Sequence, residues 1–233
     1  SILFLASCAS NMPDVSAPEI KPTESDITIE DFKTHIEFLS SDQLGGRGAG
    51  TEGDKLAVSY IKKRFYDASP NKGTVEVQEH YVFKDRRQKK DKVLTYNVIG
   101  YLVGNDEKLK DEFVVVGGHY DTTANAPGKI NNGADDNASG TSMVIELFEK
   151  FASTNNHKRT LVFMAFGGEE LGLLGSKHFV NNPTIDLDKV HLMVNLDMIG
   201  RMEENNVQLG GAASAENFSS RLHPFLMEDN VNV

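Results

Sequence analysis

The chain has 233 residues, a length that suits one α/β domain with a substantial buried core. It carries 24 Lys and Arg residues against 34 Asp and Glu residues, a formal net charge of −10, which argues against a nucleic-acid partner because such a partner needs a basic face. No run of 18 apolar residues occurs, so the sequence predicts no membrane-spanning helix.

The only cysteine, Cys8, ends a short apolar run, ILFLASC at 2–8. The end of this run resembles a bacterial lipoprotein signal, in which the cysteine carries the lipid. No Met or basic segment precedes it, so we expect a clipped signal; an ordinary apolar stretch with a chance cysteine is the alternative. Residues 9–26 are rich in Ser, Pro, Asp and Glu and predict a disordered linker. The expected location is the bacterial cell envelope, on the periplasmic or outer-membrane side, with a lipid anchor in the membrane.

Helical and strand patterns alternate from Thr28 onwards. Thr28 precedes two acidic residues and is expected to open a helix, and a Gly-rich loop at 40–54 leads into the next. Further helices are predicted at 52–68, 138–152, 171–181 and 214–229. Strands are predicted at 74–83, 94–103, 113–118, 161–166, 190–197 and 207–211. The first two strands are expected to form an antiparallel hairpin with a solvated, charged tip at 84–92.

Strands that alternate with helices indicate a sheet covered on both faces. The apolar run at 113–118 fits such a sheet, because it has no polar face to give to solvent. We therefore predict the α/β class, as a three-layer α/β/α sandwich with a mixed, mainly parallel sheet. In such folds the carboxyl ends of the strands form the functional edge.

Four polar motifs each end an apolar run: GGHYDT at 117–122, GADDNASG at 133–140, FGGEELGLLGS at 166–176 and NLDMIGR at 195–201. Together they supply one histidine and several carboxylates. So much negative charge at one sheet edge would repel itself unless cations lay among it. One histidine with several carboxylates is typical of a hydrolytic metal site.

Each motif also has a purely structural alternative. The alternatives are a buried His119–Asp121 pair, a helix cap formed by Asp136, Asn137 or Ser139, an acidic helix start at Glu169 and Glu170, and an Asp197–Arg201 ion pair. None of them explains all four motifs together, so we favour a shared metal site. Within it, we expect His119 to bind metal and Asp121 to lie behind the ring and fix its tautomer.

The order of the four motifs resembles that of metallopeptidase family 28, the di-zinc aminopeptidases, from about Ile29 to the C-terminus. The resemblance implies a catalytic domain over 27–233 that binds two Zn2+ ions and removes N-terminal residues from peptides. The implied metal ligands are His119, Asp136, Glu170 and Asp197, with Asp136 bridging both ions. It also implies Glu169 as the general base and a cis peptide bond between Asp136 and Asn137.

One part of the family pattern is missing. The second zinc of the family also takes a histidine from a later loop, and no residue after Asp197 fits that role. We therefore expect a chain truncated at Val233, which binds the second ion more weakly than the first and is poorly active or inactive. The alternatives are a glutaminyl cyclase with one zinc, a metal-dependent amide deacylase and an inactive binding relative. Other divalent ions could replace zinc.

Overall fold

The computed structural model describes residues 26–69, 73–85, 87–123, 125–202, 204–211, 214 and 220–224. The predicted lipoprotein signal at 1–8, with Cys8, and the predicted linker up to residue 25 lie outside the described residues. The chain divides into two compact units, Ser1–Met198 and Ile199–Val233, and the first holds the whole sheet. No helix among the described residues has both the length and the apolar character that crossing a membrane requires.

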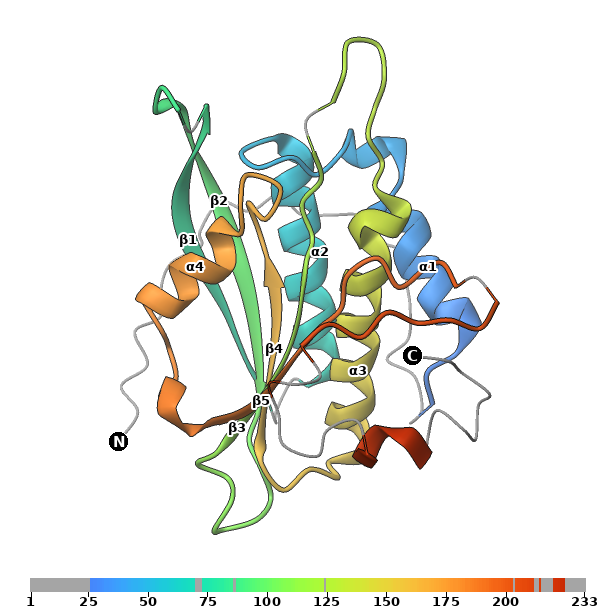
Figure 1. Ribbon diagram of the computed structural model, residues 1–233, viewed down its shortest axis with the longest axis vertical. Helices are drawn as coiled ribbons and strands as arrows, with labels where there is room; N and C mark the ends of the chain where they lie inside the picture. The colour runs from blue at the N-terminus through green and yellow to red at the C-terminus, as the bar shows by residue number, and fades with distance from the viewer. Residues whose placement is uncertain are drawn as a thin grey trace. The chain divides into compact units, whose positions relative to one another are not determined.

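A five-stranded sheet organises the first unit, in the order β1-β2-β4-β3-β5 (Figure 1). Its strands are β1 (Gly73–Asp85), β2 (Lys90–Leu102), β3 (Phe113–His119), β4 (Thr160–Phe166) and β5 (Val190–Asn195). Strand β2 runs antiparallel to β1 and β4, whereas β3 runs parallel to β4 and β5. Four of the five strands thus point the same way, which confirms the predicted mixed, mainly parallel sheet.

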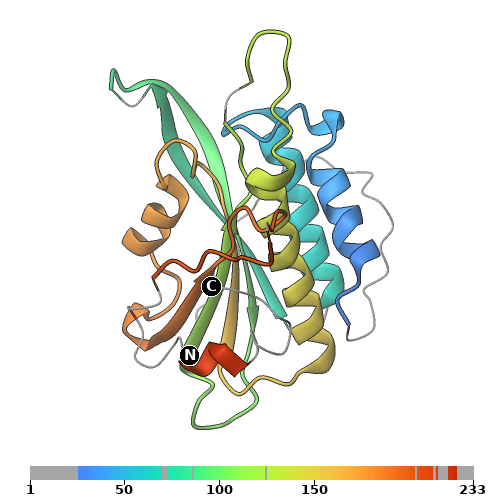
Figure 2. The same ribbon diagram turned by 45° about the vertical axis from the view of Figure 1, so that its right-hand side comes forward.

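Helices cover both faces of this sheet (Figures 1 and 2). On one face lie α1 (Ile29–Leu39), α2 (Glu52–Ala68) and α3 (Gly140–Thr154), and on the other lies α4 (Leu174–Asn181). Helices α1 and α2 begin where the sequence places a threonine: the side chains of Thr28 and Thr51 accept backbone N–H groups of the first turn. The predicted three-layer α/β/α architecture is confirmed.

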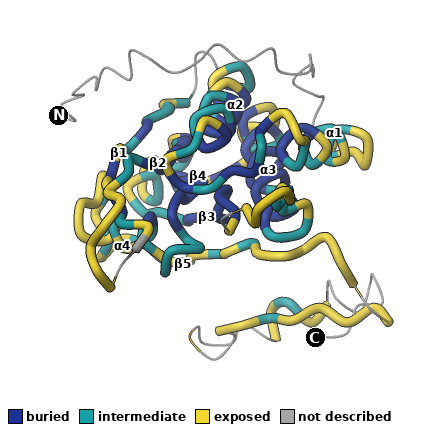
Figure 3. Tube along the Cα trace, turned by 90° about the horizontal axis from the view of Figure 1, so that it is seen from above, coloured by how far each residue is buried: buried dark blue, intermediate teal, exposed yellow. Residues whose placement is uncertain are grey.

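The main core lies between the sheet and α1, α2 and α3, where the buried segments gather in Figure 3. Strand β4 is buried along its whole length. Phe148 of α3 stacks on Phe65 of α2, with ring centroids 4.4 Å apart, and meets Phe163 of β4 edge-on at 5.3 Å. A smaller cluster, which includes Met164 and Phe179, packs beneath α4. The central strands are continuous apolar runs in the sequence because both faces of the sheet are buried there.

Several predicted elements differ from the structure. The β1–β2 ladder continues to the pair Asp85–Lys90, so the charged segment at 84–92 belongs largely to the paired strands and the tip is shorter than predicted. Helix α4 begins at Leu174 instead of 171, because Leu173 has a left-handed conformation with φ of 60°. Residues 207–211 form no strand, since this short run with two glycines has no ladder partner; of the helix predicted at 214–229, residues 220–224 are helical.

Candidate metal centre

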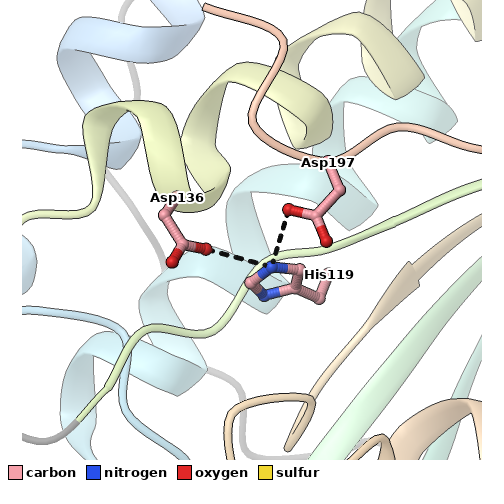
Figure 4. Close-up of side chains that lie close together, drawn as sticks. All are labelled: His119, Asp136 and Asp197. Carbon is pink, nitrogen blue, oxygen red and sulfur yellow. Dashed lines mark ion pairs between the residues drawn. The ribbon is translucent and has the colours of Figure 1, made fainter. Parts of the chain in front are cut away.

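Three motif side chains meet at the carboxyl ends of β3 and β5 (Figure 4). His119 ends β3, Asp197 follows β5 by two residues, and Asp136 lies in the π-helical turn Ala134–Ser139 before α3. Nε2 of His119 lies 3.2 Å from Oδ1 of Asp136 and 3.4 Å from Oδ1 of Asp197. The two strands are parallel neighbours, so ligands far apart in the sequence arrive at one edge of the sheet.

Glu169 and Glu170 form a second group around the same imidazole. The ligand atoms of His119, Glu169 and Glu170 all lie within 4.8 Å of one another, as do those of His119, Asp136 and Asp197. Oε2 of Glu169 lies 4.0 Å from Nδ1 of His119. The structure therefore brings together the five residues that the sequence singled out as metal ligands or general base.

Asp121 lies on the Nδ1 side of His119, away from Asp136. Nδ1 donates a hydrogen bond to the backbone carbonyl of Asp121 at 3.1 Å, whereas the carboxylate Oδ1 is 3.6 Å from that nitrogen. The carboxylate instead accepts the backbone N–H groups of Glu169 at 3.0 Å and Glu170 at 3.3 Å. The carbonyl thus holds the tautomer that leaves Nε2 free, and the side chain ties the glutamate turn to β3.

The pKa values of the cluster reflect its crowded negative charge. Burial lowers the pKa of His119, but its interaction with the nearby side chain of Asp121 and the charges of Asp197 and Glu169 outweigh burial and raise this pKa to about 9. Burial raises the pKa of Glu169. Burial and then the charge of Asp136 raise the pKa of Glu170 to about 7. A divalent cation bound among these groups would favour their deprotonated forms.

The chemistry of the donor set fits a zinc ion. One imidazole nitrogen and two carboxylate oxygens are three ligands of types that zinc uses, and three protein ligands leave a fourth position open. The histidine is buried, whereas the side chains of Asp136 and Asp197 are 47% and 43% exposed. Solvent and substrate therefore have access to the carboxylate side of the site.

Asn137 holds the segment that carries Asp197, a role that the sequence did not reveal. The peptide bond between Asp136 and Asn137 is cis, as the resemblance implied. Nδ2 of Asn137 donates to the carbonyl of Leu196 at 2.9 Å, and Oδ1 accepts the N–H of Met198 at 3.2 Å. Because these two residues flank Asp197, the buried Asn137 side chain links the positions of two predicted ligands.

A buried acid, Asp54 of α2, supports the residue after His119. The hydroxyl of Tyr120 donates to Asp54 at 2.5 Å, and the carboxylate also accepts the N–H of Gly50 at 2.7 Å and the hydroxyl of Thr95 at 3.3 Å. Burial outweighs these hydrogen bonds and raises the pKa of Asp54 to about 7. In the sequence Asp54 resembles an ordinary acidic residue of a first helical turn, so its role was missed.

Asp54 is expected to make the metal-free protein less stable as the pH rises from about 4 to about 7. Its carboxyl has an ordinary pKa of 3.8 when unfolded, so in this window the folded protein binds the extra proton. The stabilisation is complete below the unfolded value and is lost as the pH rises through the folded one. Asp54→Asn cannot titrate, so its free energy of unfolding should depend less on pH. Urea unfolding of both metal-free proteins measures this, and parallel pH profiles would contradict it.

Comparison with known proteins agrees with the motifs. Residues 97–227, more than half of the chain, match the model of peptidase family M28. Leupeptin-inactivating enzyme 1 of Streptomyces exfoliatus is 30% identical over 203 residues, which are 85% of this chain and 42% of that protein. Aminopeptidase YwaD of Bacillus subtilis is 39% identical over 114 residues, 48% of this chain and 24% of that protein. The chain spans less than half the length of these curated relatives.

Solved structures share the fold at low sequence identity. BSAP, a zinc aminopeptidase from Bacillus subtilis, superposes with a TM-score of 0.69 at 17% identity, over 91% of this chain and 80% of that one. A glutaminyl cyclase from Tannerella forsythia gives a TM-score of 0.61 at 19% identity, over 75% and 63% of the two chains. The match to the family model includes strands β3, β4 and β5 and all four motifs in full. The chain belongs to peptidase family M28.

Proposed function

We propose that this chain is the catalytic domain of a di-zinc aminopeptidase, which hydrolyses the first peptide bond of peptides with a free N-terminus. The observation that carries the proposal is the convergence of His119, Asp136 and Asp197, with Nε2 of the histidine 3.2 and 3.4 Å from the two carboxylates. When bound, zinc polarises the scissile carbonyl and lowers the pKa of water. The named aminopeptidases among the relatives support the same chemistry.

The proposed ligands divide between two ions. His119, Asp136 and Asp197 would hold the first ion, and Asp136 and Glu170 would contribute to the second. Asp136 belongs to both sets, so its carboxylate would serve both ions. Burial and then the charge of Asp136 raise the pKa of Glu170, which supports a shared role for the two carboxylates.

Glu169 is the proposed general base. Its backbone N–H is fixed by Asp121, and its side chain lies beside His119 with 28% exposure. Burial raises the pKa of Glu169, which brings the carboxylate nearer to the working pH of a proton carrier. In this role Glu169 takes a proton from the attacking water and passes it to the leaving amine. Adjacent side chains diverge, so Glu170 remains free to bind metal.

Substrates with free and blocked amines test the proposed reaction. The zinc-loaded full-length protein should release p-nitroaniline from an aminoacyl-p-nitroanilide and leave its N-acetyl derivative intact. Preferred cleavage of the acetyl group would indicate an amide deacylase. Release of ammonia from a peptide with N-terminal Gln, without nitroanilide hydrolysis, would indicate a glutaminyl cyclase. Either result would overturn the aminopeptidase assignment.

We also propose that Cys8 carries a lipid that fixes the protein to the cell envelope. The motif LASC and the polar segment that follows it support this proposal. In the full-length protein, Cys8→Ser should move the enzyme from the membrane fraction to the soluble fraction, because two or more acyl chains give stable anchoring. Fractionation and mass spectrometry of the N-terminal peptide measure the change. A wild-type protein with a free Cys8 thiol in the soluble fraction would contradict it.

A further inference from the structure

Arg47, in the Gly-rich loop, is fully buried and belongs to the largest side chains with no exposure to solvent. Burial lowers the pKa of its guanidinium to about 10, against the opposing charges of Asp121 and Asp136. Among the described residues, no carboxylate lies within ion-pair distance of Arg47, and its side chain donates to backbone carbonyls instead. Burying a cation without a direct ion pair is costly. The hydrogen bonds of Arg47 indicate which parts of the chain it holds in place.

One side of the guanidinium holds the segment that follows β3. Nε of Arg47 donates to the carbonyl of Tyr120 at 2.6 Å, and Tyr120 is the residue after His119. The backbone N–H of Arg47 donates to Oγ1 of Thr122 at 3.1 Å, on the same segment. Nη1 also donates to the carbonyl of Leu39, the last residue of α1. Arg47 thereby fixes the end of the strand that carries His119.

The other side of the guanidinium holds the turn that carries Asp136. Nη1 donates to the carbonyl of Asn132 at 2.7 Å, and Nη2 donates to that of Gly133 at 2.9 Å. The fit is close: Gly133 has φ of +53°, and a Cβ there would lie 3.0 Å from Nη2 of Arg47 and 2.2 Å from the carbonyl oxygen of Asp136. One planar group therefore joins the two segments whose side chains meet at the metal centre.

We propose that Arg47 is a positioning residue that sets the separation of His119 and Asp136 and thereby the affinity of the site for metal. This inference rests on the proposed metal centre. The planar fork of an arginine directs several donors at fixed angles, whereas a lysine ammonium has three donors at one point. A lysine at position 47 keeps the charge but cannot hold both segments at once.

Cobalt binding separates this role from general support of the fold. Co2+ replaces zinc, and its visible absorption reports the geometry of its ligands. Arg47→Lys should weaken Co2+ binding by about 10- to 100-fold, the usual effect of losing a partner that orients metal ligands, and should change the absorption bands. The matched control is Arg64→Lys. Arg64 is also buried, and it donates to Glu149 of α3 at 2.6 and 2.9 Å. The Arg64→Lys variant should be less stable than the wild type but should keep its affinity for Co2+ and its absorption bands.

Wild-type affinity and bands in Arg47→Lys, or equal losses in both lysine variants, would overturn the positioning role. A wild-type protein that binds no Co2+ would overturn the metal centre itself. If Arg47→Lys fails to fold, Thr122→Val tests the same proposal, because it removes only the acceptor of the Arg47 backbone N–H. It should weaken Co2+ binding several-fold, whereas Thr160→Val, at a buried threonine that accepts the N–H of Gly104, should not. Equal affinities in these two valine variants would overturn the proposal.

Discussion

In the full-length enzyme loaded with zinc, Glu169→Gln is expected to lower kcat by about 10²- to 10⁴-fold, the usual contribution of a general base. Gln has nearly the same shape as Glu, and the backbone N–H at this position can still donate to Asp121. The amide cannot take a proton from water, so the chemical step should fail while the metal site stays intact. Zinc content per chain should equal that of the wild type.

Glu170→Gln is the variant to compare with Glu169→Gln, because it separates loss of a metal ligand from loss of the general base. Both glutamates lie close to His119, so distance alone does not divide their roles. Glu170→Gln should reduce the zinc bound per chain, because it removes a proposed ligand of the second ion. Elemental analysis and kinetics on an aminoacyl-p-nitroanilide measure both effects. Loss of zinc in Glu169→Gln, with full zinc in Glu170→Gln, would reverse the two roles.

Removal of metal should abolish peptide hydrolysis and also lower the melting temperature. Without cations, the crowded carboxylates of the cluster repel one another: beyond burial, the charges of Asp121 and Asp136 also raise the pKa values of Glu169 and Glu170. A ligand that binds only the folded state stabilises it by about 2.7 kcal/mol at a concentration 100 times its Kd. Added zinc should therefore restore both activity and thermal stability.

A variant without the central ligand provides the control for metal removal. His119→Ala should resemble the chelated wild type in activity, and zinc should not raise its melting temperature. Calorimetric melting curves and activity, each with chelator and with zinc, give the comparison. Hydrolysis that survives in protein with no detectable metal would rule out a metal-dependent mechanism for this chain.

The position of the site could be predicted because its residues follow the apolar strands directly in the sequence. His119 and Asp197 each follow an apolar run, and such runs form central parallel strands whose carboxyl ends share one edge. Asp136 and the two glutamates lie in turns that start from the same edge. The hydrophobic periodicity, the apolar runs and the order of the motifs were therefore enough to predict that five side chains lie close together.

The supporting contacts were not predictable, because they depend on backbone groups that no sequence pattern marks. Arg47 binds carbonyls from three separate segments, and Asn137 binds the backbone on both sides of Asp197. In the sequence these residues resemble a loop cation and a helix cap. Asp54 is similar, because its burial and its bond to Tyr120 arise only when α2 packs against the sheet. Local patterns predict elements and their ends, whereas long-range polar contacts require the assembled fold.

The central claim is that His119, Asp136 and Asp197 bind a metal ion together. Anomalous diffraction from crystals of the zinc-loaded protein, recorded on both sides of the zinc absorption edge, tests this most directly. A strong zinc peak is expected about 2.0–2.2 Å from Nε2 of His119 and from one oxygen of each aspartate. Zinc peaks elsewhere on the protein, with none between these three side chains, would contradict it.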